Sequence, residues 1–177
     1  MKKGVTLWFT GLSGAGKSTI SRMVQAELVR RDYPVEVLDG DEMRKQFRHQ
    51  LGFTKQDRQT NILLSAYIAE LLNHHGIIVL AAFIAPYRDM RELCREQITH
   101  YTEIYVQCSL NTCIGRDVKG LYSKAIKGEI TQFTGISDPY EEPEAPDLVL
   151  DTESSSQEES TTQVITFLEE RGYIRKA

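Results

Sequence analysis

The amino-acid sequence predicts one α/β domain in which helices flank a parallel β-sheet. Segments with the pattern of strands alternate with segments of helical pattern along most of the chain, and this alternation favours parallel strands joined by right-handed crossovers. Residues 77–84 form a continuous apolar run, as expected of a strand that is buried on both faces. A length of 177 residues suits one domain with a core of its own, so we expect residues 1–177 to fold as a single unit.

The first part of the chain predicts a strand, a helix and a second strand. Residues 5–10 are mostly apolar and read as a buried strand. A helix is expected over residues 18–31, with an inward stripe formed by Ile20, Met23, Val24 and Leu28. Residues 32–34 end in a proline and predict a turn. The second strand is then expected over residues 35–38.

Two capping signals place the helices that follow the second strand. Asp41 is expected to cap a short helix that runs to about His49. Thr54 and Asp57 stand three residues apart, as in a variant of the capping box, and predict the start of a longer helix. Gly76 would end that helix, because glycine readily adopts the left-handed conformation found just past helix ends.

The second half of the chain continues the alternation. We expect strands over 77–84, 104–108 and 148–150, and helices over 87–98, over 110–122 and, after three serines at 154–156, over a last segment with Val164, Ile165 and Leu168 inward.

Residues 119–146 interrupt this rhythm. The segment contains three glycines, at 120, 128 and 135, three prolines, at 139, 143 and 146, and many charges. Connections longer than usual in an α/β domain are often lids or binding loops, so we expect a mobile lid here.

Composition and charge exclude several classes of protein. The formal net charge is −4, whereas general nucleic-acid-binding proteins carry a basic excess. No apolar run is long enough to span a membrane, and the first residues lead into a strand without room for a signal or transit peptide. Cys94, Cys108 and Cys113 lack metal-ligand spacing and indicate reduced thiols in the core. We expect a cytoplasmic protein without nucleic-acid or membrane partners.

Residues 11–18 (GLSGAGKS) match the phosphate-binding P-loop pattern GxxxxGK[ST] between a predicted strand and a predicted helix. Its members are Gly11, Leu12, Ser13, Gly14, Ala15, Gly16, Lys17 and Ser18. The glycines let backbone amides surround phosphate oxygens, and the following helix directs its amino terminus at the same anion. Lys17 is expected to reach the β- and γ-phosphates of ATP, and the Ser18 hydroxyl to bind Mg²⁺. A glycine-rich turn with a surface lysine is the alternative.

A P-loop alone indicates a nucleotide and not a reaction, because motors, GTPases and kinases share it. The chain is short for a motor domain, and the GTPase pattern N-K-x-D is absent. The sequence therefore predicts a small-molecule or nucleotide kinase with the P-loop kinase fold.

A second group of polar residues follows the second strand. Asp39 and Asp41 flank a glycine at its carboxyl end, where ligands bind in such sheets. A carboxylate there can hold Mg²⁺ or accept a hydroxyl proton, although an Asx turn with a helix cap would explain the same residues. Arg44 follows one turn later, and Arg58 and Asn61 share a face of the next helix. This set suits a second, anionic ligand, although each arginine alone is more often a solvated surface group.

Several stretches of the chain together resemble the adenosine 5′-phosphosulfate (APS) kinase family. They are residues 11–19, 38–44, 51–53, 57–58, 61–62, 83–88 (FIAPYR), 116–122 (RDVKGLY), 133–136 (FTGI) and 139–141 (PYE). These stretches occur in the family's order and span most of the chain. The combination of RDVKGLY with FTGI and PYE is the most specific part of the resemblance.

The resemblance implies that ATP phosphorylates the ribose 3′-hydroxyl of APS, in an enzyme that is usually a homodimer. It implies a catalytic role for Lys17 and for Asp41, which would lie near Mg²⁺ with Ser18. It adds Thr19 and Arg116 to the ATP site, with Arg116 against the adenine. The implied APS site consists of Asp39, Asp41, Arg44, Phe53, Arg58, Asn61, Ile84, Ala85, Lys119, Leu121 and Phe133. Within it, Arg44, Arg58 and Asn61 would hold the phosphosulfate. Phe53 and Phe133 would sandwich the adenine, Lys119 would contact phosphates, and the lid would span about 119–135.

The chain departs from the family pattern at two places. Ala85 stands where the family has a serine, so a phosphoenzyme at this position is closed and direct transfer is expected. Thr60, Leu63 and Leu64 replace a glutamate and two arginines, which puts in doubt any contact that those charged residues make with a dimer partner or with the amino-terminal region.

Two other functions compete with that of an active APS kinase. One is a related nucleotide or nucleoside kinase with another acceptor, against which the lid and FTGI matches weigh. The other is a retired kinase that binds nucleotide and regulates a partner such as ATP sulfurylase. Retired P-loop proteins commonly lose the lysine or the metal-binding acid, whereas Lys17, Ser18 and Asp41 are all present here.

Overall fold

The computed structural model describes residues 3–47 and 52–176, which form an α/β domain around a five-stranded parallel sheet. The strands are β1 (Val5–Thr10), β2 (Val35–Asp39), β3 (Ile78–Ala82), β4 (Tyr101–Gln107) and β5 (Leu148–Asp151), in the order β2-β3-β1-β4-β5. All five strands are parallel, so their carboxyl ends share one edge of the sheet. In α/β proteins, ligands bind at this edge, near the point where the strand order reverses. The predicted fold class is confirmed.

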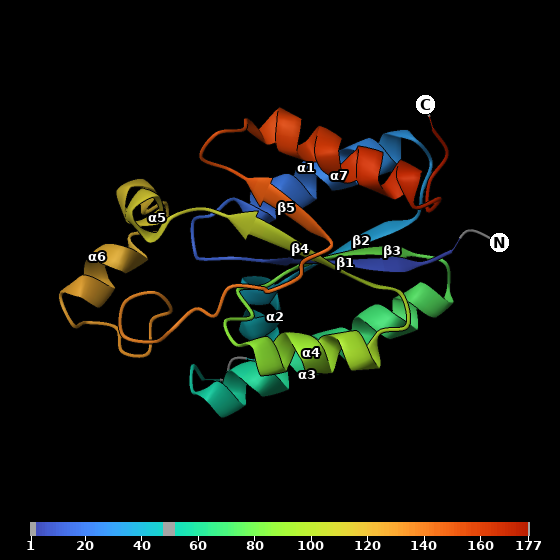
Figure 1. Ribbon diagram of the computed structural model, residues 1–177. Coiled ribbons are helices and arrows are strands. Elements are labelled where there is room, and N and C mark those ends of the chain that lie inside the picture. The colour runs from blue at the N-terminus through green and yellow to red at the C-terminus, as the bar shows by residue number, and fades with distance from the viewer. Residues whose placement is uncertain (1–2, 48–51, 177) are drawn as a thin grey trace.

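Helices cover both faces of the sheet (Figure 1). α1 (Lys17–Arg30) and α7 (Gln157–Glu170) lie on one face, and α3 (Lys55–His74) and α4 (Arg88–Gln97) on the other, beside the short α2 (Gly40–Gln46). β1 shows why both faces are apolar, because alternate side chains of a strand point to opposite sides. Leu7 and Phe9 pack in the core under α1 and α7, whereas Trp8 packs in the core under α3 and α4.

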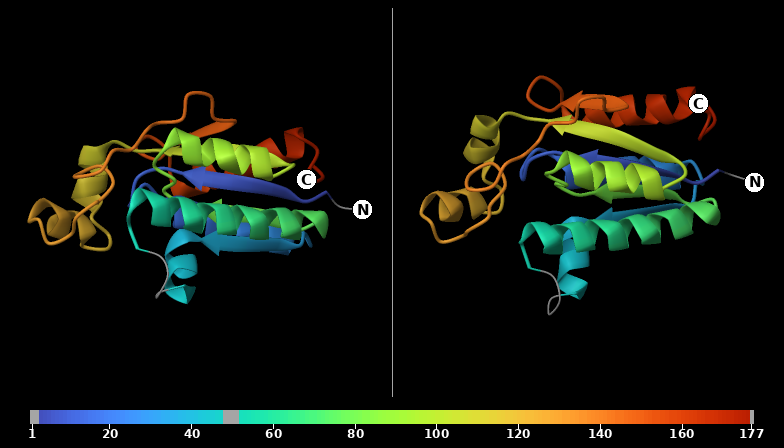
Figure 2. Two further views of the ribbon diagram at one scale, coloured as in Figure 1. Left: turned by 90° about the horizontal axis from the view of Figure 1, so that it is seen from below. Right: turned by 60° about the horizontal axis from the view of Figure 1, so that its bottom comes forward.

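Two short helices, α5 (Leu110–Arg116) and α6 (Leu121–Ile126), lie beyond the carboxyl ends of the strands (Figure 2). The prediction of one helix over 110–122 is wrong. Asp117 and Gly120 have φ angles of 25° and 64°, outside the helical range, and the Asp117 carboxylate accepts hydrogen bonds from the amides of Tyr122 and Ser123. The carboxylate thus caps a new helix and turns the chain.

Two further expectations need correction. Asp39 and not Asp41 is the cap of α2, because its carboxylate accepts hydrogen bonds from the amides of Asp41 and Glu42. Asp41 therefore lies inside the first turn. β4 begins at Tyr101 rather than at 104, because pairing with β1 extends through a more polar start of the strand. The structure gives α2 as ending at Gln46, and the predicted end at His49 lies outside the described residues.

Other local signals are confirmed. The Thr54 hydroxyl caps α3 at the amide of Asp57, and Gly76 follows its end with a φ of 75°. Ser156 and Glu159 form a complete capping box at the start of α7. Across residues 3–47 and 52–176, no helix is long and apolar enough to cross a membrane. Cys94, Cys108 and Cys113 are buried free thiols, as expected.

Candidate active site

The P-loop connects β1 to α1 at the carboxyl edge of the sheet. Gly11 is required by contact, since a Cβ there would lie 2.4 Å from the carbonyl oxygen of Val106. Gly16 has a φ of 109° and directly precedes α1, in a conformation that side chains disfavour. The Lys17 ammonium folds back over the loop and donates hydrogen bonds to the carbonyls of Gly11, at 2.9 Å, and Leu12, at 2.7 Å. These two hydrogen bonds join the end of the P-loop to its beginning.

Burial changes the chemistry of Lys17. The side chain is buried, and desolvation together with the charge of Lys119 lowers its pKa from 10.5 to about 8. Among the described residues, this ammonium donates to carbonyl oxygens and forms no ion pair with a carboxylate. Such a buried cation favours an incoming anion, because the anion would restore the lost solvation. This is the environment expected of a phosphate-binding lysine.

Asp39 links Ser18 of the P-loop to the start of α2. One of its carboxylate oxygens accepts a 2.6 Å hydrogen bond from the Ser18 hydroxyl, and the other accepts the amides that start α2. Thr19 is exposed on the first turn of α1. Both oxygens of Asp39 are thus engaged at the P-loop side of the edge.

Asp41 faces solvent at the next turn, with a side chain 61% exposed, and forms an ion pair with Lys119. Burial raises the pKa of Asp41, but the hydrogen bond and charge of Lys119 and the charge of Lys17 outweigh it, so the pKa is lowered overall. Asp41 is therefore ionised at neutral pH. The pair joins α2 to the connection between α5 and α6, two segments far apart in the sequence.

Arg58 brings the proposed acceptor segments together. Its side chain is buried and donates hydrogen bonds to the carbonyls of Phe53, at 3.0 Å, and Gln132, at 2.6 Å, with the Asp138 carboxylate 4.0 Å away. One guanidinium therefore links the segment of Phe53 to the residue preceding Phe133. The two predicted stacking rings belong to segments that meet at Arg58.

A second arginine adds positive charge beside Arg58. The Arg44 guanidinium lies 4.6 Å from the centroid of the Phe53 ring and donates a hydrogen bond to the carbonyl of Gly52. Burial and the charge of Arg58 lower the pKa of Arg44, so the two guanidinium groups act on each other. Two such cations held close together favour an anion between them.

Asn61 lies on the buried face of α3 that it shares with Arg58, as predicted. It is 2% exposed, and its Oδ1 atom has no hydrogen-bond partner among the described residues. Buried polar atoms are normally paired. An unpaired one on the same buried helix face as Arg58 is consistent with a site that a ligand completes.

Ile84 and Ala85 follow β3 into the same edge. The Thr10 hydroxyl donates a 2.6 Å hydrogen bond to the carbonyl of Ile84, and Arg91 donates one of 2.6 Å to the carbonyl of Ala85. Ala85 has a φ of 43°, which is uncommon for a residue with a Cβ. The backbone is therefore held in an unusual conformation by side chains outside the predicted site.

The segment that follows α5 is tied to the P-loop by aromatic contacts. The Tyr122 hydroxyl donates a 2.9 Å hydrogen bond to the carbonyl of Ser13, and its ring meets that of Phe133 edge to face at 5.0 Å. Leu121, which begins α6, lies next to Tyr122. Phe133 is half-buried, whereas Phe53 is 56% exposed. The proposed adenine site is thus only partly assembled in this conformation.

Arg116 extends from α5 back to the P-loop. It donates hydrogen bonds to the carbonyl of Thr152, at 2.7 Å, and more weakly to that of Gly14, at 3.4 Å. The Thr152 hydroxyl in turn donates to the carbonyl of Ala15 at 2.9 Å. Arg116 therefore lies beside the P-loop, as its predicted nucleotide role requires.

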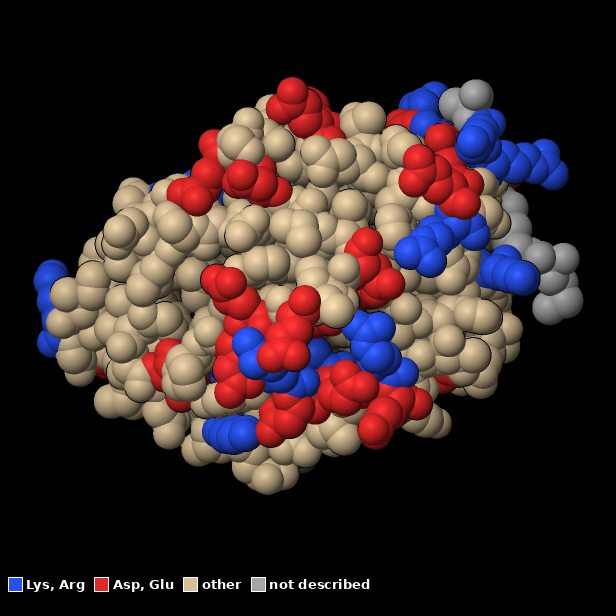
Figure 3. Space-filling view, in the orientation of Figure 1, with Lys and Arg blue, Asp and Glu red and all other residues tan. Residues whose placement is uncertain are grey.

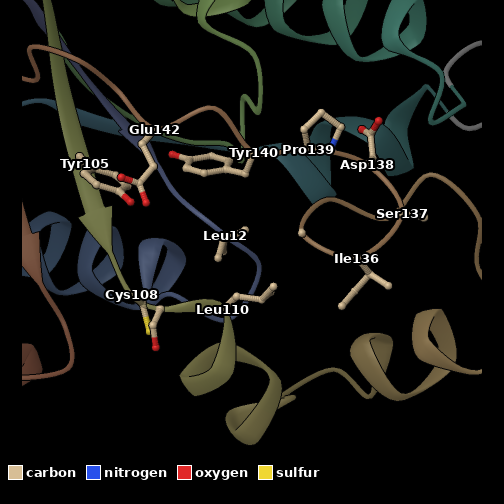
Figure 4. A pocket seen from close by; sticks show the side chains of 12 residues that line it. Leu12, Tyr105, Cys108, Leu110, Ile136, Ser137, Asp138, Pro139, Tyr140 and Glu142 are labelled. Carbon is tan, nitrogen blue, oxygen red and sulfur yellow. The ribbon is translucent and has the colours of Figure 1, made fainter.

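A cavity of about 570 Å³ lies between the P-loop, the end of β4 and the segment 135–142. Figure 4 shows Leu12, Leu110 and Ile136 around the same space. Its lining residues include Leu12 of the P-loop but not Arg44, Arg58 or Asn61. The cavity is therefore adjacent to the P-loop, and its lining residue Asp138 lies 4.0 Å from Arg58 at the border of the arginine cluster.

Comparison with known proteins identifies the family of this chain. The family model for adenylylsulphate kinase matches residues 3–151. The chain belongs to this family. It is 53% identical to the adenylyl-sulfate kinase of Halothermothrix orenii over 98% of this chain and 94% of the relative. It is also 49% identical, over 97% of this chain, to a probable bifunctional SAT/APS kinase of Sorangium cellulosum, of which it covers 29%.

A solved structure shows the same architecture. The structure of the Mycobacterium tuberculosis APS kinase in complex with AMPPNP and APS superposes with a TM-score of 0.92, at 40% identity, over 96% of this chain and 99% of that one. This likeness confirms that the P-loop kinase fold of the adenylylsulphate kinase family extends over nearly the whole chain.

Several residues at this edge escaped the sequence analysis. Thr10, Arg91, Tyr122, Asp138 and Thr152 all position site segments through hydrogen bonds. Their residue types carry no ligand signal, and their partners are mostly backbone carbonyls from distant segments. Only the three-dimensional arrangement shows these roles.

Three of the four positions that depart from the family pattern, Thr60, Leu63 and Leu64, lie on α3, whereas Ala85 follows β3. The Thr60 hydroxyl is exposed and donates a hydrogen bond to the carbonyl of Gln56 within the helix, while Leu63 and Leu64 are half-buried. Among the described residues, the hydrogen bonds and ring contacts of Arg44 and Arg58 go to other residues than these three. Leu51, which belongs to a matching stretch, lies outside the described residues.

Proposed function

We propose that this protein transfers the γ-phosphoryl group of ATP to the 3′-hydroxyl of APS, giving 3′-phosphoadenosine 5′-phosphosulfate (PAPS) and ADP. The observation that carries the proposal is the arrangement at the carboxyl edge of the sheet, where Lys17 folds over the P-loop and the Arg44 and Arg58 guanidinium groups lie at the Phe53 ring. We infer that these two arginines and Asn61 form a separate anion site. Membership of the adenylylsulphate kinase family supports this choice of acceptor.

The residues divide into a donor side and an acceptor side. On the donor side, the P-loop from Gly11 to Ser18 would hold the phosphates, and Arg116 would lie along the adenine. Lys17 would exchange its two carbonyl partners for phosphate oxygens. On the acceptor side, Arg44, Arg58 and Asn61 would hold the phosphosulfate, and Phe53 and Phe133 would stack on the base. Asp39, Ile84, Ala85, Lys119 and Leu121 would complete this side, Asp39 through the position of α2.

The transfer is an in-line displacement. The 3′-oxygen of APS bonds to the γ-phosphorus, the bond from that phosphorus to the β–γ bridging oxygen breaks, and its electron pair leaves with ADP. Asp41 would accept the hydroxyl hydrogen bond and orient the nucleophile. Because the pKa of Asp41 is lowered, the proton would pass on to solvent rather than stay on the carboxylate. Ala85 cannot carry a phosphoryl group, so transfer would be direct.

The oxygen donors at this edge fit Mg²⁺. The Ser18 hydroxyl and the Asp39 carboxylate are in contact at 2.6 Å, Asp41 stands two residues further along, and Mg²⁺ prefers such oxygen ligands. No cluster of three or more His, Cys, Asp or Glu side chains within residues 3–47 and 52–176 could hold a metal alone, so the phosphates of ATP would share the ion. We assign Ser18 and Asp41 to this site. When bound, the ion would offset charge on the β- and γ-phosphates.

The wider organisation is proposed on the same basis. Residues 1–177 would act as one domain, with a lid over about 119–135 that closes on the substrates. We propose a homodimer, a cytoplasmic location and the option of association with an ATP sulfurylase. The bifunctional SAT/APS kinase from Sorangium cellulosum supports the last of these.

An assay of ADP release tests the proposed function directly. The protein is supplied with ATP, Mg²⁺ and one acceptor at a time: APS, AMP or adenosine. We expect turnover with APS and far less with AMP, which lacks the sulfate that the arginines would hold. Turnover with another acceptor but not with APS would indicate a related kinase. Binding of ADP without turnover on any acceptor would indicate a nucleotide-binding regulator.

A further inference from the structure

Arg91 is the most enclosed cation of α4. Its side chain is 3% exposed, and its Nε atom lies 2.8 Å from the Glu103 carboxylate of β4 in a buried ion pair. The same guanidinium donates 2.6 Å hydrogen bonds to the carbonyls of Ala85 and Glu141. Arg88 and Arg95 of the same helix reach the surface instead, where Figure 3 shows charges of both signs gathered over α4.

The first of these contacts fixes the backbone between β3 and α4. Arg91 holds the carbonyl of Ala85 and Thr10 holds that of Ile84. Both carbonyls are thus taken, and among the described residues neither the Ile84 amide nor the Ala85 amide donates a hydrogen bond. Ala85 keeps its φ of 43° only if its surroundings hold it there, because a Cβ makes this conformation costly.

The second contact fixes the segment 138–142 against the same loop. Arg91 holds the carbonyl of Glu141, whose amide donates a 2.8 Å hydrogen bond to the carbonyl of Pro86. Asp138, at the start of this segment, accepts a 2.8 Å hydrogen bond from the Tyr87 hydroxyl and lies 4.0 Å from Arg58. The placement of the segment therefore reaches the arginine of the acceptor site.

We propose that Arg91, held by Glu103, is the positioning residue of the acceptor site, which sets the Ile84–Ala85 backbone and the segment 138–142 in the arrangement that binds APS. This inference rests on the proposed function and adds a residue to it that does not touch substrate. Arginine is needed because its planar fork donates in several fixed directions at once, whereas the lysine ammonium is a single point of charge on a flexible stem.

The structure offers a matched control one turn along α4. Arg95 also pairs with Glu103, at 2.9 Å, but the hydrogen bonds of its side chain do not extend to Ala85 or Glu141. Arg91→Lys and Arg95→Lys therefore both change a cation that pairs with Glu103. Only the first removes the hold on the acceptor segments.

The test compares steady-state constants of the two variants with those of the wild-type protein, after thermal melting has shown the fraction folded. We expect Arg91→Lys to raise the KM for APS about tenfold or more, an amount typical of a lost charge-assisted hydrogen bond, with the KM for ATP within about twofold. Arg95→Lys should leave both constants near wild type. A purely structural role would instead lower the melting temperature and the active fraction without separating the two KM values.

Three results would overturn the proposal. They are an unchanged KM for APS in folded Arg91→Lys, equal increases for both substrates, and the same selective increase in Arg95→Lys. If Arg91→Lys does not fold, the test uses Glu103→Gln instead, which removes the negative charge that pairs with Arg91 but keeps the shape of the side chain and one acceptor oxygen. A smaller but still APS-selective increase in KM is then expected, and its absence contradicts the proposal. Failure of the wild-type protein to phosphorylate APS would instead refute the proposed function.

Discussion

At the scale of single residues, Lys17 shows how a buried charge prepares a site for its ligand. The ammonium is desolvated, and its two carbonyl partners are neutral. A neutral partner stabilises a charge less than a phosphate does. Nucleotide binding should therefore strengthen the protonated form of Lys17, and the proton and the nucleotide should bind together.

The lowered pKa of Lys17, about 8, predicts a pH dependence. Only the ammonium form pairs with phosphate, so the affinity for ADP should fall above pH 8 by at most about tenfold per pH unit. Calorimetry in two buffers of different ionisation heat should detect proton uptake on binding between about pH 8 and pH 9. Lys17→Arg, which stays protonated, should lose this dependence. A flat affinity up to about pH 10 would contradict the assignment.

The same pKa has a consequence for stability. Lys17 loses its proton at lower pH in the folded protein than in the unfolded chain, where the pKa is near 10.5. Between these two values the unfolded chain binds more protons, so the contribution of Lys17 to the free energy of unfolding increases with rising pH. Bound ADP should weaken this trend, since it favours the protonated form and so raises the pKa of Lys17 in the folded protein toward its unfolded value.

Asp41 allows a test of chemistry at one residue. Asp41→Asn keeps the shape but removes the charge that orients the nucleophile, so we expect kcat to fall at least about 10²-fold, as for other preorganised groups. The affinity for ADP should change little, because the P-loop remains. Asp39→Asn is a useful comparison, since its amide oxygen can still cap α2 but the carboxylate oxygen that accepts the Ser18 hydroxyl is lost, which should lower the melting temperature as well. Near-normal turnover in Asp41→Asn would remove Asp41 from the catalytic role.

Residue patterns predicted part of this site. The P-loop, with Lys17 and Ser18, follows from a motif that has one structural meaning. The cap of α2 could not be predicted from a motif, because Asp39 and Asp41 are both aspartates beside the same glycine. Only the hydrogen bond from Ser18 to Asp39 separates their roles. The role of Arg91 could not be predicted, since its partners are the Glu103 carboxylate and two backbone carbonyls, at Ala85 and Glu141, that are far apart in sequence.

At the scale of elements, the sheet was the most predictable part. β3 is a continuous apolar run and β1 is mostly apolar, and both are buried on both faces. Short runs of this kind, rich in β-branched and aromatic residues, indicate buried strands. The helix predicted over 110–122 failed because its apolar pattern continues through a break that a single carboxylate, Asp117, creates by capping α6. Periodicity reports which face is buried and does not report such a local turn.

The segment from Lys119 to Gly135 is joined to the remainder of the site at separate points, which are the Lys119–Asp41 ion pair, the hydrogen bond from Tyr122 to Ser13 and the hydrogen bond from Arg58 to Gln132. We predict that the residues between these points behave as a lid. Lys119 pairs with the exposed Asp41, and α6 is only six residues long. Trypsin should therefore cut at Lys124 or Lys127, which are exposed, in the free protein. ADP and APS together should protect both sites, because closure orders the segment.

The control for this experiment is ADP alone, which should protect less than the two ligands together. Lys119→Ala should accelerate cutting in the free protein by removing the ion pair with Asp41. Equal rates of cutting with and without both ligands would contradict a closing lid.

At the scale of the whole molecule, the site is assembled from segments that the sequence keeps far apart. The donor side comes from the loop between β1 and α1, and the acceptor side from α2, α3, the end of β3 and the segment 132–142. A parallel sheet places all of these at one edge, so the general location of the site could be predicted from the order of the elements. The link through Arg58 could not be predicted, because it depends on how the irregular segment that contains Gln132 folds back onto α3.

This separation predicts that the two ligands can be lost independently. Among the described residues, the hydrogen bonds and the ion pair of Arg58 go to Phe53, Gln132 and Asp138 and not to the P-loop. Arg58→Ala should therefore weaken the binding of APS by about 2–5 kcal/mol, as for other truncated buried charge contacts. The affinity for ADP should stay within a few-fold of wild type. Phe133→Ala should weaken APS by about 1–3 kcal/mol if it removes a base-stacking contact. Arg58→Lys should recover only part of the loss, because an ammonium cannot make the bidentate contact.

The measurement is a pair of calorimetric titrations for each variant, one with ADP and one with APS, after melting curves have shown that the variant is folded. Arg22→Ala is the matched control, because Arg22 is a surface arginine whose ion pair, with Glu42, is exposed, and it should change neither affinity. Equal loss of both ligands in folded Arg58→Ala would refute the division into two sites. Loss of neither would make Arg58 a structural arginine, whose hydrogen bonds to Phe53 and Gln132 serve the fold and not the acceptor.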